Sequence, residues 1–184
     1  MTASGSYSPA QKVLHWATAL AVLVMIPLGL YMVWRYGATD FDAVTVRLFD
    51  IHKLIGFILL WLVAARLGLR LARGVPPAPS GLHPLQRIAA DMTHRALYVL
   101  LFVVPVLGWM GASAYDLRSL PGGFALPEIV AHNPDLAGRI MWWHLWTAIL
   151  LGALAAMHIG AALLHLVFFK DGVFQRMWPS RRNS

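Results

Sequence analysis

Histidine is the residue type through which this sequence could do chemistry. The chain has eight histidines and no cysteine, so thiolate zinc sites, iron–sulfur clusters and covalent Cys-x-x-Cys-His haem attachment are excluded. An ionisable side chain inside a membrane is costly and usually faces the interior of a helix bundle. Six of the histidines lie in or at the ends of long apolar runs: His15, His52, His94, His144, His158 and His165.

The spacing of His144 and His158 indicates what these side chains bind. They are fourteen residues apart on one apolar run, which in an α-helix puts them on nearly the same face and about 21 Å apart in height. If each met a histidine from a facing helix, the two pairs would supply the axial nitrogens of two b-type haems. A single intramembrane histidine more often only hydrogen-bonds a neighbouring helix, but four at matched depths disfavour that interpretation.

The elements that must position these histidines are membrane-spanning helices. Of the 184 residues, 59% are hydrophobic and 12% charged, with a mean hydropathy of +0.63, which excludes a free-standing water-soluble globule. The runs long enough to cross about 30 Å of hydrocarbon are Val13–Trp34, Leu54–Ala72, Ala96–Ala114 and Ile140–Phe169. We therefore predict one all-α domain over residues 1–184, an integral membrane four-helix bundle with up-down topology and helices at approximately 9–35, 49–73, 91–115 and 138–169.

The charged residues predict the orientation of the bundle. The connections at 35–53 and 115–139 contain five basic and six acidic residues, whereas the N-terminal segment, residues 66–95 and the tail after Phe169 contain ten basic and two acidic. By the positive-inside rule, both termini are then cytoplasmic. The net charge of +7 is mostly this orientation signal, and no nucleic-acid module is indicated. The basic residues expected to contact anionic lipid are Lys170, Arg176, Arg181 and Arg182.

Orientation decides which histidines pair. The first helix runs outward and places His15 at the inner level with His158, while the second runs inward and places His52 at the outer level with His144. We therefore expect the first pair to hold an inner haem iron and the second pair an outer one. The fourth helix carries many small residues, which would leave space for flat macrocycles beside it. They would serve close packing of helices equally well. These residues are Gly152, Ala153, Ala155, Ala156, Gly160, Ala161 and Ala162.

Three further residues at the inner level each have more than one interpretation. Arg66 follows His52 by the same fourteen-residue offset, so it either pairs with an inner-haem propionate or extends past the membrane border into water. His94 competes with His15 for His158, or holds a propionate or a quinone. His165 either donates to a quinone carbonyl or meets lipid head groups.

Several short pieces of the chain match a known family. They are Tyr7-Ser8, His15-Trp16, Ile51-His52, Trp143-His144, His158 and the tail Phe169-Lys170-Asp171 with Arg176-Met177-Trp178-Pro179. In these pieces the sequence resembles the bacterial cytochrome b561 family, which is related to the dihaem cytochrome b subunits of membrane nickel–iron hydrogenases and formate dehydrogenases. The resemblance implies that the four matching histidines are the ligands of two b haems. It also implies electron transfer to or from quinone in the bacterial inner membrane, and some members are described as superoxide oxidases.

Two function classes follow, with a third as an alternative. In the first, the chain is a superoxide:ubiquinone oxidoreductase: superoxide, steered by Lys53 and Arg139, gives its electron at the outer haem, and ubiquinone is reduced near His165. In the second, it is a non-enzymatic electron-transfer cytochrome or a membrane anchor subunit that serves a periplasmic dehydrogenase. The third, a haem-free channel or transporter, is disfavoured because no acidic residue lies within any span.

Overall fold

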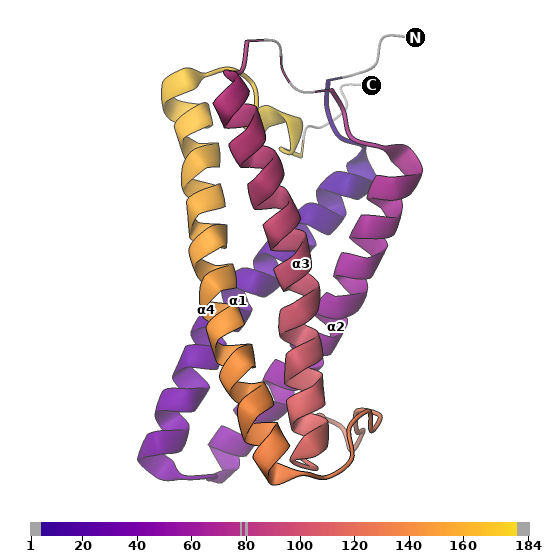
Figure 1. Ribbon diagram of the computed structural model, residues 1–184, viewed down its shortest axis with the longest axis vertical. Helices are drawn as coiled ribbons and strands as arrows, with labels where there is room; N and C mark the ends of the chain where they lie inside the picture. Colours follow the sequence, from indigo (N-terminus) through magenta and orange to yellow (C-terminus); the bar gives the residue numbers. More distant parts are fainter. Residues whose placement is uncertain (1–4, 78, 80, 180–184) are drawn as a thin grey trace.

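The computed structural model describes residues 5–77, 79 and 81–179. Four α-helices run alternately up and down the molecule (Figure 1): α1 (Pro9–Thr39), α2 (Ala43–Arg73), α3 (Pro84–Ala114) and α4 (Pro134–Leu164). A π-helical turn at His165–Phe169 and a 3-10 turn at Phe174–Arg176 follow α4. Over the described residues there is no strand, and an isolated bridge joins Ser119 to Ala125. The predicted all-α four-helix bundle is confirmed.

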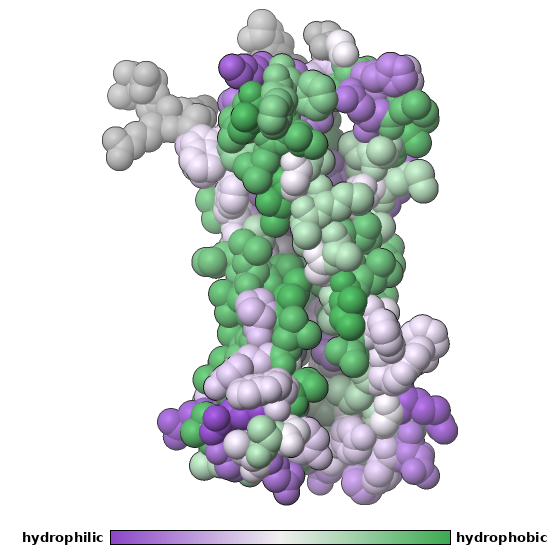
Figure 2. Space-filling model, turned by 90° about the vertical axis from the view of Figure 1, so that its left-hand side faces the viewer, coloured by the Kyte–Doolittle hydropathy of each residue, from purple (hydrophilic) through white to green (hydrophobic). Residues whose placement is uncertain are grey.

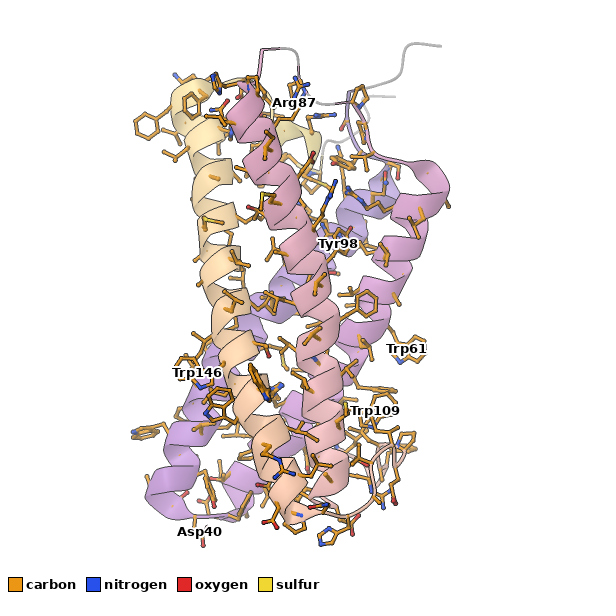
Figure 3. All side chains as sticks on the ribbon, in the orientation of Figure 1. Asp40, Trp61, Arg87, Tyr98, Trp109 and Trp146 are labelled. Atoms are coloured by element: carbon orange, nitrogen blue, oxygen red, sulfur yellow. The ribbon has the colours of Figure 1, made fainter. Side chains whose placement is uncertain are left out.

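All four helices are long and apolar enough to span a membrane. Each α-helix has 31 residues, or about 46 Å at 1.5 Å per residue, so the ends project beyond about 30 Å of hydrocarbon. The most apolar stretches have mean hydropathies of 1.9 to 2.0. Figure 2 shows hydrophobic side chains over the middle of one face and hydrophilic residues at both ends. Trp61 and Trp146 point outward from the bundle (Figure 3) and are 61% and 51% exposed.

Capping residues set where the helices begin. Ser8 accepts a hydrogen bond from the Gln11 amide and forms a capping box at the start of α1. Asp42 and Asn133 accept from the third residue of α2 and α4 in the same way. His83, which the sequence places in a loop, caps α3 by accepting from the Leu85 amide. The helices therefore extend beyond the uncharged runs, because apolarity marks only the part of a helix that lies in hydrocarbon.

The bundle core is a small apolar layer at mid-height. The helices pack chiefly as two antiparallel hairpins, α1 with α2 and α3 with α4, with α2 also against α3. The buried residues of the layer are Val22, Leu59, Val63, Leu100, Leu101 and Leu151. This layer lies between the level of His52 and His144 and the level of His15 and His158. It contains no charged side chain.

One end of the bundle, called here the termini end, gathers both described chain ends. The Tyr7 amide donates to the Arg176 carbonyl, and the Arg176 guanidinium donates to the carbonyls of Gly5 and Pro77. Trp16 Nε1 and Lys12 Nζ of α1 donate to the carbonyls of Met177 and Trp178, both at 2.9 Å. The C-terminal segment thus ties α1 to the α2–α3 connection. That this end faces the cytoplasm stays a prediction.

The opposite end, called here the cap end, is covered by residues 115–133. Trp109 Nε1 of α3 donates to the Pro127 carbonyl at 2.9 Å (Figure 3). Ser113 Oγ accepts from the amides of Ile129 and Val130 and donates to the Val130 carbonyl. The segment is therefore held against the helix ends by the polar groups of α3.

Candidate functional site

At the cap end, His52 of α2 faces His144 of α4. Their ring centroids are 6.2 Å apart and their ring planes lie at 84°. Both side chains are half-buried, whereas Trp143 and Leu145, the neighbours of His144, are exposed. The histidine therefore points into the bundle while its neighbours point out of it, as the sequence pattern predicted.

At the termini end, His15 of α1 faces His158 of α4. Their ring centroids are 6.4 Å apart with ring planes at 78°. His94 of α3 lies at the same level, with its centroid 5.3 Å from that of His158. The structure thus brings together both pairs that the topology predicted and adds a third imidazole to the second pair.

The number of ligands in each pair and the spacing of their rings fit a haem. Within the described residues, no group of three or more histidine, aspartate or glutamate side chains is arranged to hold a metal. A porphyrin brings four nitrogens of its own and needs two from the protein. Two metal–imidazole bonds of about 2 Å, with each ring centroid about 1 Å behind its nitrogen, separate the centroids by about 6 Å. The two predicted pairs have this spacing, and His94 with His158 is closer together.

Two of these imidazoles also lack a protein partner. The Nδ1 atoms of His15 and His52 are buried and have no hydrogen-bond partner in the described part of the chain. A buried polar atom left unsatisfied costs about 1–3 kcal/mol. The alternative interpretation, a histidine that only hydrogen-bonds a neighbouring helix through Nδ1, therefore does not account for these two rings.

Two glycines that the sequence did not single out make room for the cap-end pair. A Cβ on Gly29 of α1 would lie 3.3 Å from His52 Cε1, and one on Gly108 of α3 would lie 3.0 Å from His144 Cε1. His144 Nδ1 lies 2.9 Å from the Val104 carbonyl of α3. Of the small residues that the sequence did single out, Gly152 packs against Ile26 and Gly160 has open space beside it. No pattern within α1 or α3 could have identified the two glycines, because their role depends on which helix faces them.

Arg66 lies at the level of the termini-end pair, as its offset predicted. Its guanidinium carbon is 5.2 Å from the centroid of Tyr98, and that of Arg70 is 5.6 Å from the same ring. Tyr98 lies on the side of α3 that faces α2 (Figure 3), one helical turn beyond His94. Neither arginine has a carboxylate partner among the described residues, so both remain available to a propionate.

His165 is paired with an acid rather than free. Its Nδ1 lies 2.6 Å from Asp171 Oδ2, just past the π-helical turn. Partial burial raises the pKa of Asp171, but hydrogen bonds from the Val173 amide and the His165 ring outweigh it and hold the pKa below its ordinary value. Of the basic tail residues, Lys170 is exposed and Arg176 ties the chain ends together, while Arg181 and Arg182 lie outside the described residues.

The two cationic residues predicted to steer an anion have different surroundings. Lys53 Nζ lies 2.8 Å from Asp50 Oδ1 and donates to the Leu117 carbonyl and to Ser119 Oγ. Arg139 is exposed on α4, has no ion pair among the described residues, and lines a shallow groove of about 300 Å³ with Gly138, Trp142 and Trp143. Lys53 therefore holds residues 115–133 against α2. The charge of Arg139 is not neutralised by an acidic side chain among the described residues.

Comparison with known proteins agrees with this arrangement. The family model described as prokaryotic cytochrome b561 matches residues 6–180. The chain belongs to the prokaryotic cytochrome b561 family. Cytochromes of the b561 family bind haem b, and the two histidine pairs fit such a group. With its four spans, this b561 cytochrome is a multi-pass, haem-binding electron-transport protein of the bacterial inner membrane.

Three relatives of this b561 chain differ in what their names say of them. The chain is 32% identical to cytochrome b561 homolog 2 of Escherichia coli, over 93% of this chain and 90% of the relative. It is 31% identical to cytochrome b562 of Cereibacter sphaeroides over 98% and 100%. It is 25% identical to the probable superoxide oxidase CybB of Yersinia pestis over 96% and 97%.

Proposed function

We propose that this chain carries electrons across the membrane between two haem b groups. His52 with His144 would hold one at the cap end, and His15 with His158 would hold the other at the termini end. The observation that carries the proposal is the repeated ring spacing of the two pairs, 6.2 and 6.4 Å, on the two sides of one apolar layer. Haem b, when bound, supplies an iron that changes between the ferrous and ferric states.

The protein's own residues set what kind of electron donor is suitable. Because each pair would give two histidines to the haem that it held, the protein would leave oxygen no position at which to bind. The chain would then take single electrons from a donor that approaches the cap end without ligating the metal. Superoxide is such a donor, since it becomes O2 on losing one electron. The exposed guanidinium of Arg139 offers the positive potential that attracts an anion.

A quinone is the electron acceptor that we propose at the termini end. Two superoxide anions supply two electrons, and ubiquinone takes these and two protons to become ubiquinol, while two O2 are released. His165, held through Nδ1 by Asp171 at 2.6 Å, would present its other nitrogen to a quinone carbonyl and pass a proton to it. His94 either assists there or, like Arg66 beside Tyr98, holds a propionate at the same level.

A second candidate function is favoured by the charges of the cap end. Arg35 pairs with Asp42, Arg118 with Asp116 and Glu128, and Lys53 with Asp50. Much of the cationic charge there is thus neutralised, and a mixed surface suits docking of a protein better than capture of a small anion. In this alternative the chain is an electron-transfer cytochrome or membrane anchor that accepts electrons from a periplasmic dehydrogenase.

The first experiment measures the haem content of the detergent-purified protein from its pyridine haemochrome spectrum. We expect two b haems per chain, falling to about one in each of His144→Ala and His158→Ala, because each variant removes a ligand from one pair only. His83→Ala is the matched control, since it removes a histidine that caps a helix and faces water. One haem in the parent protein would contradict the two-pair arrangement.

A second experiment separates the two functions. Superoxide generated enzymatically should reduce the haems of the parent protein, and Arg139→Gln should slow this reduction. Lys53→Gln should loosen the cap with a smaller effect on the rate. If superoxide leaves the haems oxidised while a periplasmic redox protein reduces them, the carrier function is correct and superoxide is not the substrate.

A further inference from the structure

His144 differs from the other proposed ligands in having a hydrogen bond to its ring. Its Nδ1 lies 2.9 Å from the carbonyl oxygen of Val104. His52 and His15 have buried Nδ1 atoms without a partner, and within the described residues the ring nitrogens of His158 have no hydrogen bond. The two pairs therefore differ in the hydrogen bonding of their rings, and the hydrogen-bonded ring belongs to the pair at the cap end.

The partner of His144 determines where its proton lies. A carbonyl oxygen only accepts, so Nδ1 must carry the hydrogen and donate it to Val104. The neutral ring then keeps its lone pair on Nε2, which is the nitrogen left for a metal. Because the acceptor is a backbone atom of α3, this tautomer is fixed by helix packing rather than by a mobile side chain.

Gly108 makes this hydrogen bond possible. It lies one turn after Val104 on α3, and a Cβ there would be 3.0 Å from His144 Cε1 and 3.2 Å from Nδ1. A side chain at this position would force the His144 ring to shift by a few tenths of an ångström and so weaken its hydrogen bond to the carbonyl. The carbonyl has two lone pairs, so it can serve the helix and His144 together.

We propose that Gly108 and the Val104 carbonyl are a positioning device that sets the redox potential of the cap-end haem, an inference that rests on the proposed function. A hydrogen bond from Nδ1 makes the imidazole a stronger donor to iron. Stronger donation stabilises the ferric state and lowers the midpoint potential. A lower potential at the cap end, where the donor arrives, favours electron transfer from there toward the termini end.

Ligand replacement tests the hydrogen bond directly. In His144→Gly, either imidazole or 1-methylimidazole is added to fill the space of the missing ring, and the haem potentials are measured by spectroelectrochemical titration. Imidazole can donate to Val104 and 1-methylimidazole cannot, so we expect a lower cap-end potential with imidazole. His52→Gly is the matched control, since His52 has no such acceptor and the two ligands should give equal potentials there. Equal potentials in both variants would overturn the proposal.

Gly108→Ala tests the same device without removing a ligand. We expect the cap-end potential to rise, or that haem alone to be lost, while the termini-end potential stays unchanged. Gly68→Ala is the control, because a Cβ on Gly68 meets no atom within 4 Å. Two retained haems with unchanged potentials in Gly108→Ala would overturn the proposal.

The same samples separate this proposal from the assignment of the ligands. If His144→Gly keeps both haems without any added imidazole, His144 is not an axial ligand, and both the proposed function and the device fail. If one haem is lost and regained with either ligand at equal potential, the ligand assignment holds and only the positioning device is wrong.

Discussion

His52 and His144 face each other from α2 and α4 with their ring planes at 84°, and His15 and His158 repeat the arrangement at 78°. Within each pair the two rings come from different helices, so the crossing angle of their planes is set by the packing of the bundle. Such an angle has a spectroscopic consequence once both rings bind one iron.

We predict that the oxidised protein gives two low-spin ferric signals with strongly anisotropic g values. Perpendicular axial imidazoles leave two iron d orbitals nearly equal in energy, whereas parallel rings separate them. Electron paramagnetic resonance of the frozen protein measures this. His144→Ala should abolish one signal and His158→Ala the other, and a rhombic, weakly anisotropic spectrum would mean that the rings rotate on binding haem.

Ser113→Ala should destabilise the cap end. Ser113 is 1% exposed, and its hydroxyl accepts from the amides of Ile129 and Val130 at 3.0 Å each. Removing it leaves buried amides without an acceptor, at a cost of about 1–3 kcal/mol. Hydrogen exchange at Ile129 and Val130 should become faster. Phe124→Ala is a suitable comparison because it removes a side chain of the same segment that is 72% exposed, and equal exchange rates in the two variants would contradict the role assigned to Ser113.

Arg176→Ala should release the C-terminal segment from the termini end. The guanidinium joins the carbonyls of Gly5 and Pro77, which come from two other segments of the chain. We expect faster proteolysis after residue 170 and a lower melting temperature, with both haems retained. Arg87→Ala removes an exposed arginine from the same end and should leave both measurements unchanged.

Asp171→Asn should lower the melting temperature at neutral pH more than at acid pH. The pKa of Asp171 in the folded chain lies below its ordinary value of 3.8, so its ionised form contributes stability above that value. This contribution is lost as the pH falls through the lower, folded pKa. The melting temperatures of the parent and the variant should therefore draw together as the pH falls from 7 to below the folded pKa of Asp171. Asp91→Asn, which removes an exposed acid with no ion pair among the described residues, should show no convergence.

The place of quinone reduction can be tested by comparing two sites at the termini end. One is His165 with Asp171, and the other is a cavity of about 1110 Å³ lined by Tyr7, Lys12, Val13 and Trp16 among others. We expect His165→Ala to slow reoxidation of the reduced haems by ubiquinone, and Val13→Trp, which adds a large side chain to the wall of the cavity, to leave it unchanged. Slowing by Val13→Trp alone would place the quinone in the cavity.

Much of the site could be predicted from the sequence because height along a helix is a local property. The fixed rise per residue sets His144 and His158 at two levels, and the alternating direction of the helices brings His52 and His15 to the same levels. The number of membrane-spanning helices could be predicted from the apolar runs, whose length is also a local property. The confirmed fold class follows from these quantities, and none of them requires knowledge of how the helices pack.

Tertiary structure decided everything that depends on the rotation of one helix against another. Gly108 and Val104 of α3 meet His144 only because α3 and α4 pack face to face, and Gly29 meets His52 for the same reason on α1 and α2. The ion pair and hydrogen bonds that tie Lys53 to the cap depend on how residues 115–133 fold back. The sequence by itself determined the heights of the histidines and the number of helices, since these follow from local geometry. Their partners were decided by packing, since contacts between helices are not encoded in any one of them.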